Sequence, residues 1–257
     1  MNKLSQYVGN TPLIPITIGG YTVWGKCEFM NPSGSVKDRM ASFIVNDAER
    51  RKILKRGSTL CEATSGNSGI AFAMLAAERG YKMVIIMPSN MSEERKNMFR
   101  YYDKMCEEKG WFNCNQFHNP LNIQAHYETT GPEIYGQYNM YNSHPDVFVA
   151  GTGTGGTLMG TTKYMKTKWK DIKVVAVEPA ESPVMSGGEP GLHGIQGIGD
   201  GSKFLVDLDF VDDISVIATD CAKAMTKHLA KKYGLFIGIS GGANVFASFQ
   251  WLRDNNK

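Results

Sequence analysis

Short runs of consecutive apolar residues alternate along this chain with longer segments in which apolar residues recur every three or four positions. Strands buried on both faces of a parallel sheet have unbroken apolar sequences, whereas a helix packed on such a sheet is apolar along one side. The apolar runs predict strands at Lys82–Met87, Asp146–Ala150, Val174–Val177 and Leu235–Ile239. The helical spacing predicts helices at Ser68–Arg79 and Thr219–Tyr233, each ended by a glycine. This alternation is typical of an α/β fold with a mostly parallel sheet.

The composition narrows the class of protein. A chain of 257 residues is long enough for one large α/β domain or for two lobes that share a cleft. The net charge of +3 is small and dispersed, which argues against nucleic-acid binding. No apolar window approaches the length of a membrane span, and the N-terminus lacks a signal-peptide core. The five cysteines form no Cys-x-x-Cys pair and the five histidines lack metal-ligand spacing, so we expect free thiols, a cytoplasmic protein and no metal site.

The segment from Asn31 to Arg39, Asn-Pro-Ser-Gly-Ser-Val-Lys-Asp-Arg, puts Lys37 at the joint between a turn and a helix. A lysine fixed at a helix start has a set direction, and its amine can lose solvation and attack a carbonyl to form a Schiff base. An exposed lysine that merely follows a capping turn would give the same local pattern. The segment alone leaves both interpretations open.

Three strand-to-helix turns are rich in Gly, Ser and Thr. In the first, Glu62–Gly69, six polar or glycine residues in a row (positions 64–69) exceed what a helix cap requires and favour a bound carboxylate or other anion. The third, Gly238–Ala243, presents Ser240 either as a helix cap or as a neutral hydroxyl facing a ligand at the carboxyl end of the sheet. A further glycine-rich segment, His193–Gly199, is predicted to be a loop wall.

The second turn, Gly151–Thr157, lies between a predicted strand and a helix, and its glycines allow the backbone to approach an anion closely. We interpret it as a phosphate site. Gly151, Gly153 and Gly156 also fit G-x-G-x-x-G, and Glu178 follows where a dinucleotide fold keeps its ribose acid. NAD binding is therefore an alternative, although that interpretation gives Lys37 no role.

Taken together and in this order, these segments resemble the fold-type II pyridoxal-phosphate enzymes, specifically the cysteine synthase (O-acetylserine sulfhydrylase) and cystathionine β-synthase family. The resemblance runs from about residue 5 to residue 248. Its motifs are Gly9–Leu13, Asn31–Arg39, Thr64–Gly69, Met91–Arg95, Gln116–Pro120, Thr129–Ile134, Gly153–Thr157, Val177–Pro179 with Ser182 and Pro183, Ile195–Gly199, and Gly238–Ala243.

The resemblance implies a two-lobed, tryptophan synthase β-like α/β fold of mostly parallel sheets, with pyridoxal 5'-phosphate in the cleft between the lobes. Residues 1–34 and 120–257 would form the larger, phosphate-binding domain. Residues 35–119 would form the smaller, mobile, substrate-binding domain, shortened near 103–116. The least regular part of the first half is expected from Asp103 to Gln116, where only about a dozen residues replace a further strand and helix.

Carried over residue by residue, the resemblance makes Lys37 the Schiff-base lysine and the catalytic base. The cofactor would further be bound by Asn67 at its ring hydroxyl, by Gly153, Thr154, Gly155, Gly156 and Thr157 at its phosphate, and by Ser240 at its pyridine nitrogen. The substrate would be bound by Thr64, Ser65, Gly66, Ser68, Gln116 and Gly197. Ser68 stands where the family usually has threonine, which keeps the hydroxyl.

The implied reaction is β-replacement: L-cysteine is made from O-acetyl-L-serine and sulfide through an aminoacrylate. A hydroxyl opposite the pyridine nitrogen makes the ring a weaker electron sink than an aspartate would, which favours β-elimination over transamination. Three alternatives stay open: a related β-replacement on phosphoserine or on serine with homocysteine, a serine/threonine dehydratase, and a weakly catalytic cofactor-binding partner protein.

The resemblance also concerns assembly. It implies a homodimer, and a cleft that can bind the C-terminal tail of serine acetyltransferase. Members of the family normally continue beyond the position of Lys257 with another strand and a loop near the pyridine ring. We therefore expect a sheet edge that is either exposed or covered by a dimer partner.

Overall fold

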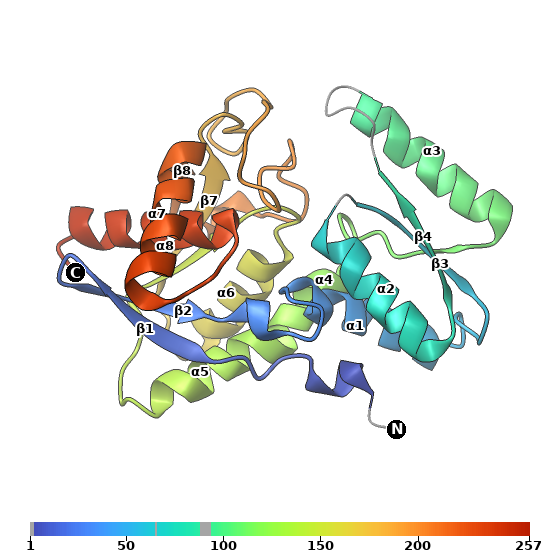
Figure 1. The fold of residues 1–257 in the computed structure, drawn as a ribbon, viewed down its shortest axis with the longest axis horizontal. Helices are drawn as coiled ribbons and strands as arrows, with labels where there is room; N and C mark the ends of the chain where they lie inside the picture. Colours follow the sequence, from blue (N-terminus) through green and yellow to red (C-terminus); the bar gives the residue numbers. More distant parts are fainter. Residues whose placement is uncertain (1–2, 65, 88–93) are drawn as a thin grey trace. The chain divides into compact units, whose positions relative to one another are not determined.

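The computed structural model describes residues 3–64, 66–87 and 94–257, which form two compact units (Figure 1). Unit 1 comprises Met1–Thr11 and Glu28–Ala125, and unit 2 comprises Pro12–Cys27 and His126–Lys257. The domain boundaries expected from the sequence assign residues 1–11, 28–34 and 120–125 differently. Hydrogen bonds explain part of this difference, because Gly9 N–H donates to Asn31 Oδ1 (2.8 Å) and Arg39 pairs with Glu28. The mobility expected of residues 35–119 stays a prediction.

Unit 1 is built on a three-stranded parallel sheet of order β4-β3-β5. Its strands are β3 (Thr59–Ala63), β4 (Lys82–Ile86) and β5 (Phe112–Asn113). Its helices are α1 (Lys37–Arg50), α2 (Asn67–Arg79), α3 (Glu94–Lys109) and α4 (Leu121–Ala125), with 3₁₀ turns η1 (Leu4–Tyr7) and η2 (Glu28–Met30). Ile44 of α1, Phe72 of α2 and Leu60 of β3 share one apolar cluster, whereas Cys61 and Ala63 pack with α3 on the other face.

Unit 2 contains a second parallel sheet of order β6-β7-β8 and an antiparallel hairpin. The sheet strands are β6 (Val147–Gly151), β7 (Lys173–Pro179) and β8 (Asp213–Ile217), and the hairpin strands are β1 (Leu13–Ile18) and β2 (Tyr21–Lys26). The helical elements are η3 (a π-helical turn, His126–Thr130), α5 (Gly131–Asn139), α6 (Gly156–Lys168), η4 (a 3₁₀ turn, Leu208–Phe210), α7 (Thr219–Tyr233) and α8 (Ile239–Asp254).

The two faces of the unit 2 sheet are covered by different helix pairs. Val177 and Ile217 pack with Ala222 of α7 and Ala243 of α8, whereas α5 and α6 contribute to a separate cluster that includes Phe148. The hairpin (blue in Figure 1) packs its apolar residues against α7 and α8. Three layers of helix, sheet and helix are the architecture that the alternating sequence pattern predicted.

Most of the predicted elements are confirmed, and two predictions are wrong. Leu235–Ile239 is not a strand: this segment pairs with no other among the described residues, Phe236 is 81% exposed, and α8 already begins at Ile239. The apolar side chains of Leu235 and Ile237 pack in the cluster that includes the hairpin, which explains the apolar pattern without a strand. Residues 103–116 are also more regular than expected, since α3 continues to Lys109 and β5 follows. The sequence pattern missed β5, β8 and the β1–β2 hairpin.

None of the helices in the part of the chain that the structure describes is long and apolar enough to cross a membrane.

Candidate active site

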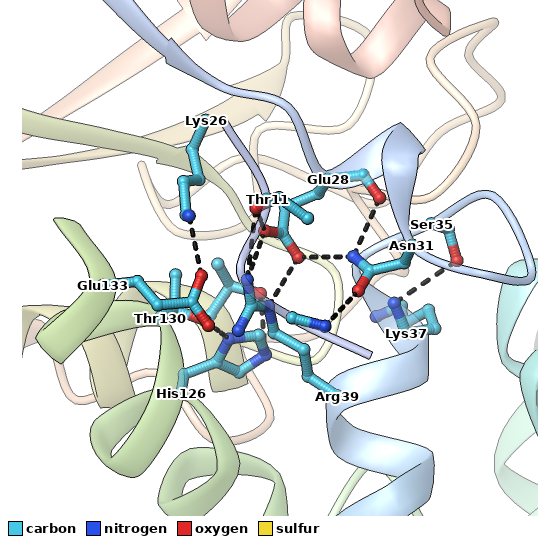
Figure 2. Close-up of polar contacts among 12 residues, drawn as sticks. Thr11, Lys26, Glu28, Asn31, Ser35, Lys37, Arg39, His126, Thr130 and Glu133 are labelled. Carbon is cyan, nitrogen blue, oxygen red and sulfur yellow. Dashed lines mark hydrogen bonds and ion pairs between the residues drawn. The ribbon is translucent and has the colours of Figure 1, made fainter. Parts of the chain in front are cut away.

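The turn before α1 fixes the position of Lys37. Gly34 has a φ of +89°, a conformation that favours glycine, and its N–H donates to the carbonyl of Asn31 (2.8 Å). The backbone N–H and the hydroxyl of Ser33 both donate to the carboxyl of Asp38, the former at 2.7 Å. Burial raises the pKa of Asp38, and the bonds from Ser33 oppose that rise. Lys37 is therefore the first residue of α1, half-buried, with its N–H donating to Ser35 Oγ (3.3 Å; Figure 2).

A buried ion pair holds the first turn of α1 from the other side. Arg39 is fully buried, and its Nε and one Nη each donate to a different carboxylate oxygen of Glu28 at 2.7 Å (Figure 2). Glu28 also accepts from Thr11 Oγ1 (2.6 Å) and from Asn31 Nδ2 (2.9 Å). Two parallel bonds between a guanidinium and a carboxylate fix orientation as well as distance. The helix that begins at Lys37 is thus anchored two residues further on.

The predicted carboxylate-binding turn follows β3 in unit 1. Thr64 Oγ1 accepts from the N–H of Gly66 (3.2 Å), and α2 begins at Asn67, which is exposed. Ser68 is buried, and its hydroxyl donates to Gln116 Oε1 at 2.6 Å. The structure therefore brings together two residues that lie 48 positions apart in the sequence. Ser65, also predicted here, lies outside the described residues.

Glu62 lies beneath this turn and is fully buried. Its Oε2 accepts from the backbone N–H of Gln116 and its Oε1 from the side-chain Nε2, both at 3.3 Å. Burial raises the pKa of the Glu62 carboxyl to about 8, although the bonds from Gln116 and the charge of Lys37 lower it. The sequence interpretation gave Glu62 no role of its own. The available signal was a charged residue among the apolar residues at positions 60–63 of the strand.

The predicted phosphate turn lies at the start of α6 in unit 2. Gly153, Thr154, Gly155 and Gly156 are all buried, and Gly155 caps the helix with a φ of +87°. A β-carbon on Gly153 would lie 2.7 Å from the carbonyl oxygen of Gly197, so only glycine fits there. The first N–H groups of a helix have no partner within it, and together with the helix dipole they attract an anion.

Side chains and loops support this turn. Thr157 Oγ1 lies 3.2 Å from Nε2 of the buried His126, whose Nδ1 is 2.8 Å from Thr130 Oγ1. Gly197, predicted to bind substrate, lies against Gly153. Ser240 is the second residue of α8 and is partly exposed. Unit 2 thus contains a glycine-rich turn at a helix start. Unit 1 contains Lys37 and the buried amide of Gln116.

The carboxylate that the NAD interpretation requires is used by the protein itself. Glu178 at the end of β7 is buried, and its Oε2 accepts from the N–H of Met185 (2.7 Å). Its Oε1 accepts from the N–H (2.9 Å) and the hydroxyl (2.5 Å) of Ser186. Glu178 therefore holds the loop after β7 in place, and both of its oxygens are engaged.

Comparison with known proteins shows which family the chain belongs to. Residues 4–256 match the family described as pyridoxal-phosphate dependent enzymes. A cysteine synthase of Staphylococcus aureus is 38% identical over 100% of this chain and 90% of its own length. The solved structure of a hydrogen sulfide-producing enzyme from Fusobacterium nucleatum is 39% identical, with a TM-score of 0.88 over 99% of this chain and 93% of that one. A cysteine synthase structure from Entamoeba histolytica is 34% identical, with a TM-score of 0.85 over 100% and 83%. The chain is a member of the pyridoxal-phosphate dependent enzyme family.

Proposed function

We propose that this protein makes L-cysteine from O-acetyl-L-serine and sulfide by pyridoxal-phosphate-dependent β-replacement. The observation that carries the proposal is the buried Ser68–Gln116 pair, in which Ser68 follows β3 and Gln116 follows β5. It occurs in a chain that matches a cysteine synthase over its whole length. Amino-acid carboxylates are bound by neutral donors of this kind. With Thr64 and Gly66, the pair supports a binding site for the carboxylate of the substrate.

The residues of the phosphate turn fit a phosphorylated cofactor. A β-carbon on Gly155 would meet Val206 Cγ2 at 2.6 Å, and one on Gly153 would meet Gly197, so both positions exclude side chains. The backbone N–H groups at the start of α6 are the donors that would bind an anion. Gly153, Thr154, Gly155, Gly156 and Thr157 would hold the phosphate, Asn67 the ring hydroxyl, and Ser240 the pyridine nitrogen.

The chemistry of Lys37 follows from its place at a helix start. Pyridoxal phosphate, when bound, supplies an electron sink next to the α-carbon of an attached amino acid. Lys37 Nζ would form the covalent link to the cofactor and, once an amino acid displaces it, accept the proton from the α-carbon. The proton held by Lys37 Nζ would balance the loss of acetate, which would leave the β-carbon with the bonding electron pair. After the sulfur of hydrosulfide bonds to that carbon, Lys37 Nζ would return the proton to the α-carbon.

A second candidate is release of sulfide from an amino acid, and the resemblance to the Fusobacterium nucleatum enzyme favours it specifically. The same base at Lys37 and the same carboxylate donors would serve, because only the β-substituent and the nucleophile differ. Rates with different substrates separate the candidates. Cysteine formation from O-acetylserine plus sulfide supports the first, sulfide release from L-cysteine alone supports the second, and O-phosphoserine, serine with homocysteine, and serine or threonine alone complete the panel.

The test uses the purified protein loaded with pyridoxal phosphate. We expect a visible absorption band from the lysine-linked cofactor that changes when O-acetylserine is added and returns when sulfide follows, with formation of L-cysteine. Lys37→Ala should abolish both the band and turnover. Lys55→Ala, which removes an exposed lysine of the same unit, should leave both unchanged. Full activity of Lys37→Ala would overturn the assignment, and a yellow protein inert to every amino acid of the panel would overturn the proposed reaction.

Assembly and compartment belong to the same proposal. We propose a homodimer, to be tested by light scattering, and binding of the serine acetyltransferase C-terminal peptide in competition with O-acetylserine. A protein that is monomeric at micromolar concentration, or peptide binding that leaves the KM for O-acetylserine unchanged, would count against these points. All five cysteines are free thiols, which supports a reducing compartment such as the cytoplasm.

A further inference from the structure

Three buried polar side chains form a continuous chain beneath the carboxylate-binding turn of unit 1. Ser68, Gln116 and Glu62 are each 3% exposed or less. Ser68 Oγ is 2.6 Å from Gln116 Oε1, and Gln116 Nε2 is 3.3 Å from Glu62 Oε1. The backbone holds the middle residue in place, because Gln116 N–H donates to Glu62 Oε2 (3.3 Å) and Asn122 Nδ2 donates to the Gln116 carbonyl (3.0 Å). A half-turn of the Gln116 side-chain amide would swap the positions of Oε1 and Nε2 while the backbone stays in place.

The donors and acceptors of this chain depend on one proton. An ionised carboxylate only accepts hydrogen bonds, so Gln116 Nε2 must face Glu62 and Gln116 Oε1 takes the hydroxyl proton of Ser68. A neutral carboxyl group donates one hydrogen bond. Gln116 Oε1 can then accept from Glu62, Nε2 donates to Ser68 Oγ, and the hydroxyl proton of Ser68 becomes free to bind another group.

We propose that Glu62 is a positioning residue whose proton sets the orientation of the Gln116 amide and thereby makes the Ser68 hydroxyl available to a carboxylate bound at the turn after β3. The inference rests on the proposed function in one respect, namely that the bound carboxylate belongs to the amino-acid substrate. With Glu62 neutral, the bound anion gains a donor and meets no buried negative charge. With Glu62 ionised, it loses that donor and is repelled.

The thiols and the phenol near Glu62 do not change their charge in the pH range in which Glu62 titrates. Burial raises the pKa values of Cys61 on β3, Cys106 and Tyr102 on α3, and Cys114 after β5, so these groups are neutral near pH 8. Lys37 on α1 is a cation that acts on Glu62, and its charge favours the ionised carboxylate. The carboxyl pKa of about 8 puts the exchange between pH 7 and 9.

The direct test follows the side-chain NH₂ signals of Gln116 by NMR in protein labelled with ¹⁵N at glutamine side chains, assigned with Gln116→Glu. In the wild type we expect the signals to shift with a midpoint near pH 8, and in the isosteric, permanently neutral variant Glu62→Gln we expect no such titration. The signal of Gln137, which accepts from Lys26 in unit 2, serves as the internal control. Absence of a titration in the wild type, or the same titration in both proteins, would overturn the proposal.

The functional test measures the dissociation constant of propionate by calorimetry on the cofactor-loaded protein, because propionate carries the carboxylate without an ionising amine. From pH 7 to pH 9 we expect binding to weaken at least fivefold in the wild type and less than twofold in Glu62→Gln. Ser68→Ala should weaken binding at pH 7 and reduce the pH dependence to the part that comes from repulsion by ionised Glu62. Parallel profiles in the wild type and Ser68→Ala would contradict the proposal, even if Glu62→Gln did not fold.

These measurements separate this inference from the proposed function. A protein that makes cysteine but shows no titration of Gln116 would retain the proposed function and lose the positioning role of Glu62. A protein that makes no cysteine but shows both the titration and the pH-dependent binding of propionate would retain the Glu62 switch as a property of a carboxylate site with another substrate.

Discussion

The ion pair between Arg39 and Glu28 offers a sharp test of how the helix that begins at Lys37 is held. The perturbation is Arg39→Met, which keeps much of the side-chain volume and removes the charge and the donors to Glu28 and Thr11. The Arg39 side chain is 0% exposed and that of Glu28 is 16% exposed, so the remaining carboxylate would have little access to water. Thr11 and Asn31 would still donate to it.

The magnitude follows from these contacts. Removing one partner of a buried ion pair costs about 3–5 kcal/mol, because the other charge is left buried. Two donors remain for Glu28 and some water reaches it, which places the expected loss at the lower end, about 3 kcal/mol. Since a whole domain is stable by roughly 5–15 kcal/mol, this loss is a large fraction of the total.

The assay is urea unfolding followed by circular dichroism, with and without pyridoxal phosphate. We expect Arg39→Met to lower the urea midpoint by roughly 1–2 M. The matched control is Arg50→Met at the other end of α1, where the arginine is 79% exposed and its pair with Asp47 contributes about 0.5 kcal/mol or less. Adding Glu28→Gln to Arg39→Met removes the uncompensated charge and should recover part of the loss.

If the unfolding free energy of Arg39→Met lies within about 1 kcal/mol of that of Arg50→Met, the ion pair does not stabilise the protein as estimated. Such a result would mean that the remaining donors or water compensate Glu28 without the guanidinium. A loss that Glu28→Gln does not reduce would also contradict it, because the cost would then come from packing and not from charge.

The remaining predictions concern the phosphate turn, a pH profile and the thiols. Gly153→Ala should weaken pyridoxal-phosphate binding at least tenfold in a fluorescence titration, because its β-carbon would lie 2.7 Å from the Gly197 carbonyl oxygen. The control Gly136→Ala, whose β-carbon would have nothing within 4 Å, should bind the cofactor normally. Equal affinities of the two variants would refute the steric argument. Because burial raises the pKa of Glu62 to about 8, the folded state binds this proton more tightly than the unfolded state does. The unfolding free energy should therefore fall by up to about 5 kcal/mol as the pH rises from 4.5 to 8. The same pH profile of stability in Glu62→Gln would contradict this. Cys221 is the one cysteine of the chain that is not buried, so a maleimide should modify it first and Cys221→Ser should remove the fast phase; a fast phase that persists would be inconsistent with the structure.

The glycine-rich turns show how far local sequence determines local structure. Gly34, Gly155 and Gly197 all have φ angles between 87° and 92°, which side-chain-bearing residues rarely adopt, so each marks a turn in the sequence as well as in the structure. Other elements were predictable because each follows from a short local pattern. They are the helix starts at Lys37 and Asn67 and the apolar strands β4, β6 and β7. The family resemblance depended on the order of these patterns.

The segments that the sequence pattern missed or predicted wrongly depend on distant partners. Leu235 and Ile237 have the composition of a strand, yet they contact the hairpin and leave Phe236 exposed. Strand β5 is two residues long and exists because Leu60 and Cys61 of β3 pair with it. A hydrophobic run specifies burial, and only the tertiary fold decides whether burial occurs in a sheet or beside one.

The sequence by itself determined the α/β class, the two glycine-rich strand-to-helix turns and the lysine at a helix start, because each depends on residues that are neighbours in the chain. Only the tertiary structure decided that Glu28 and Arg39 compensate each other's charge, that Glu178 is occupied by its own loop, and that Glu62 contacts the backbone and the amide of Gln116. These facts depend on which buried polar groups meet across distant segments. Burial makes such groups costly unless they are paired, and the pairing is set by the packing of the elements that carry them.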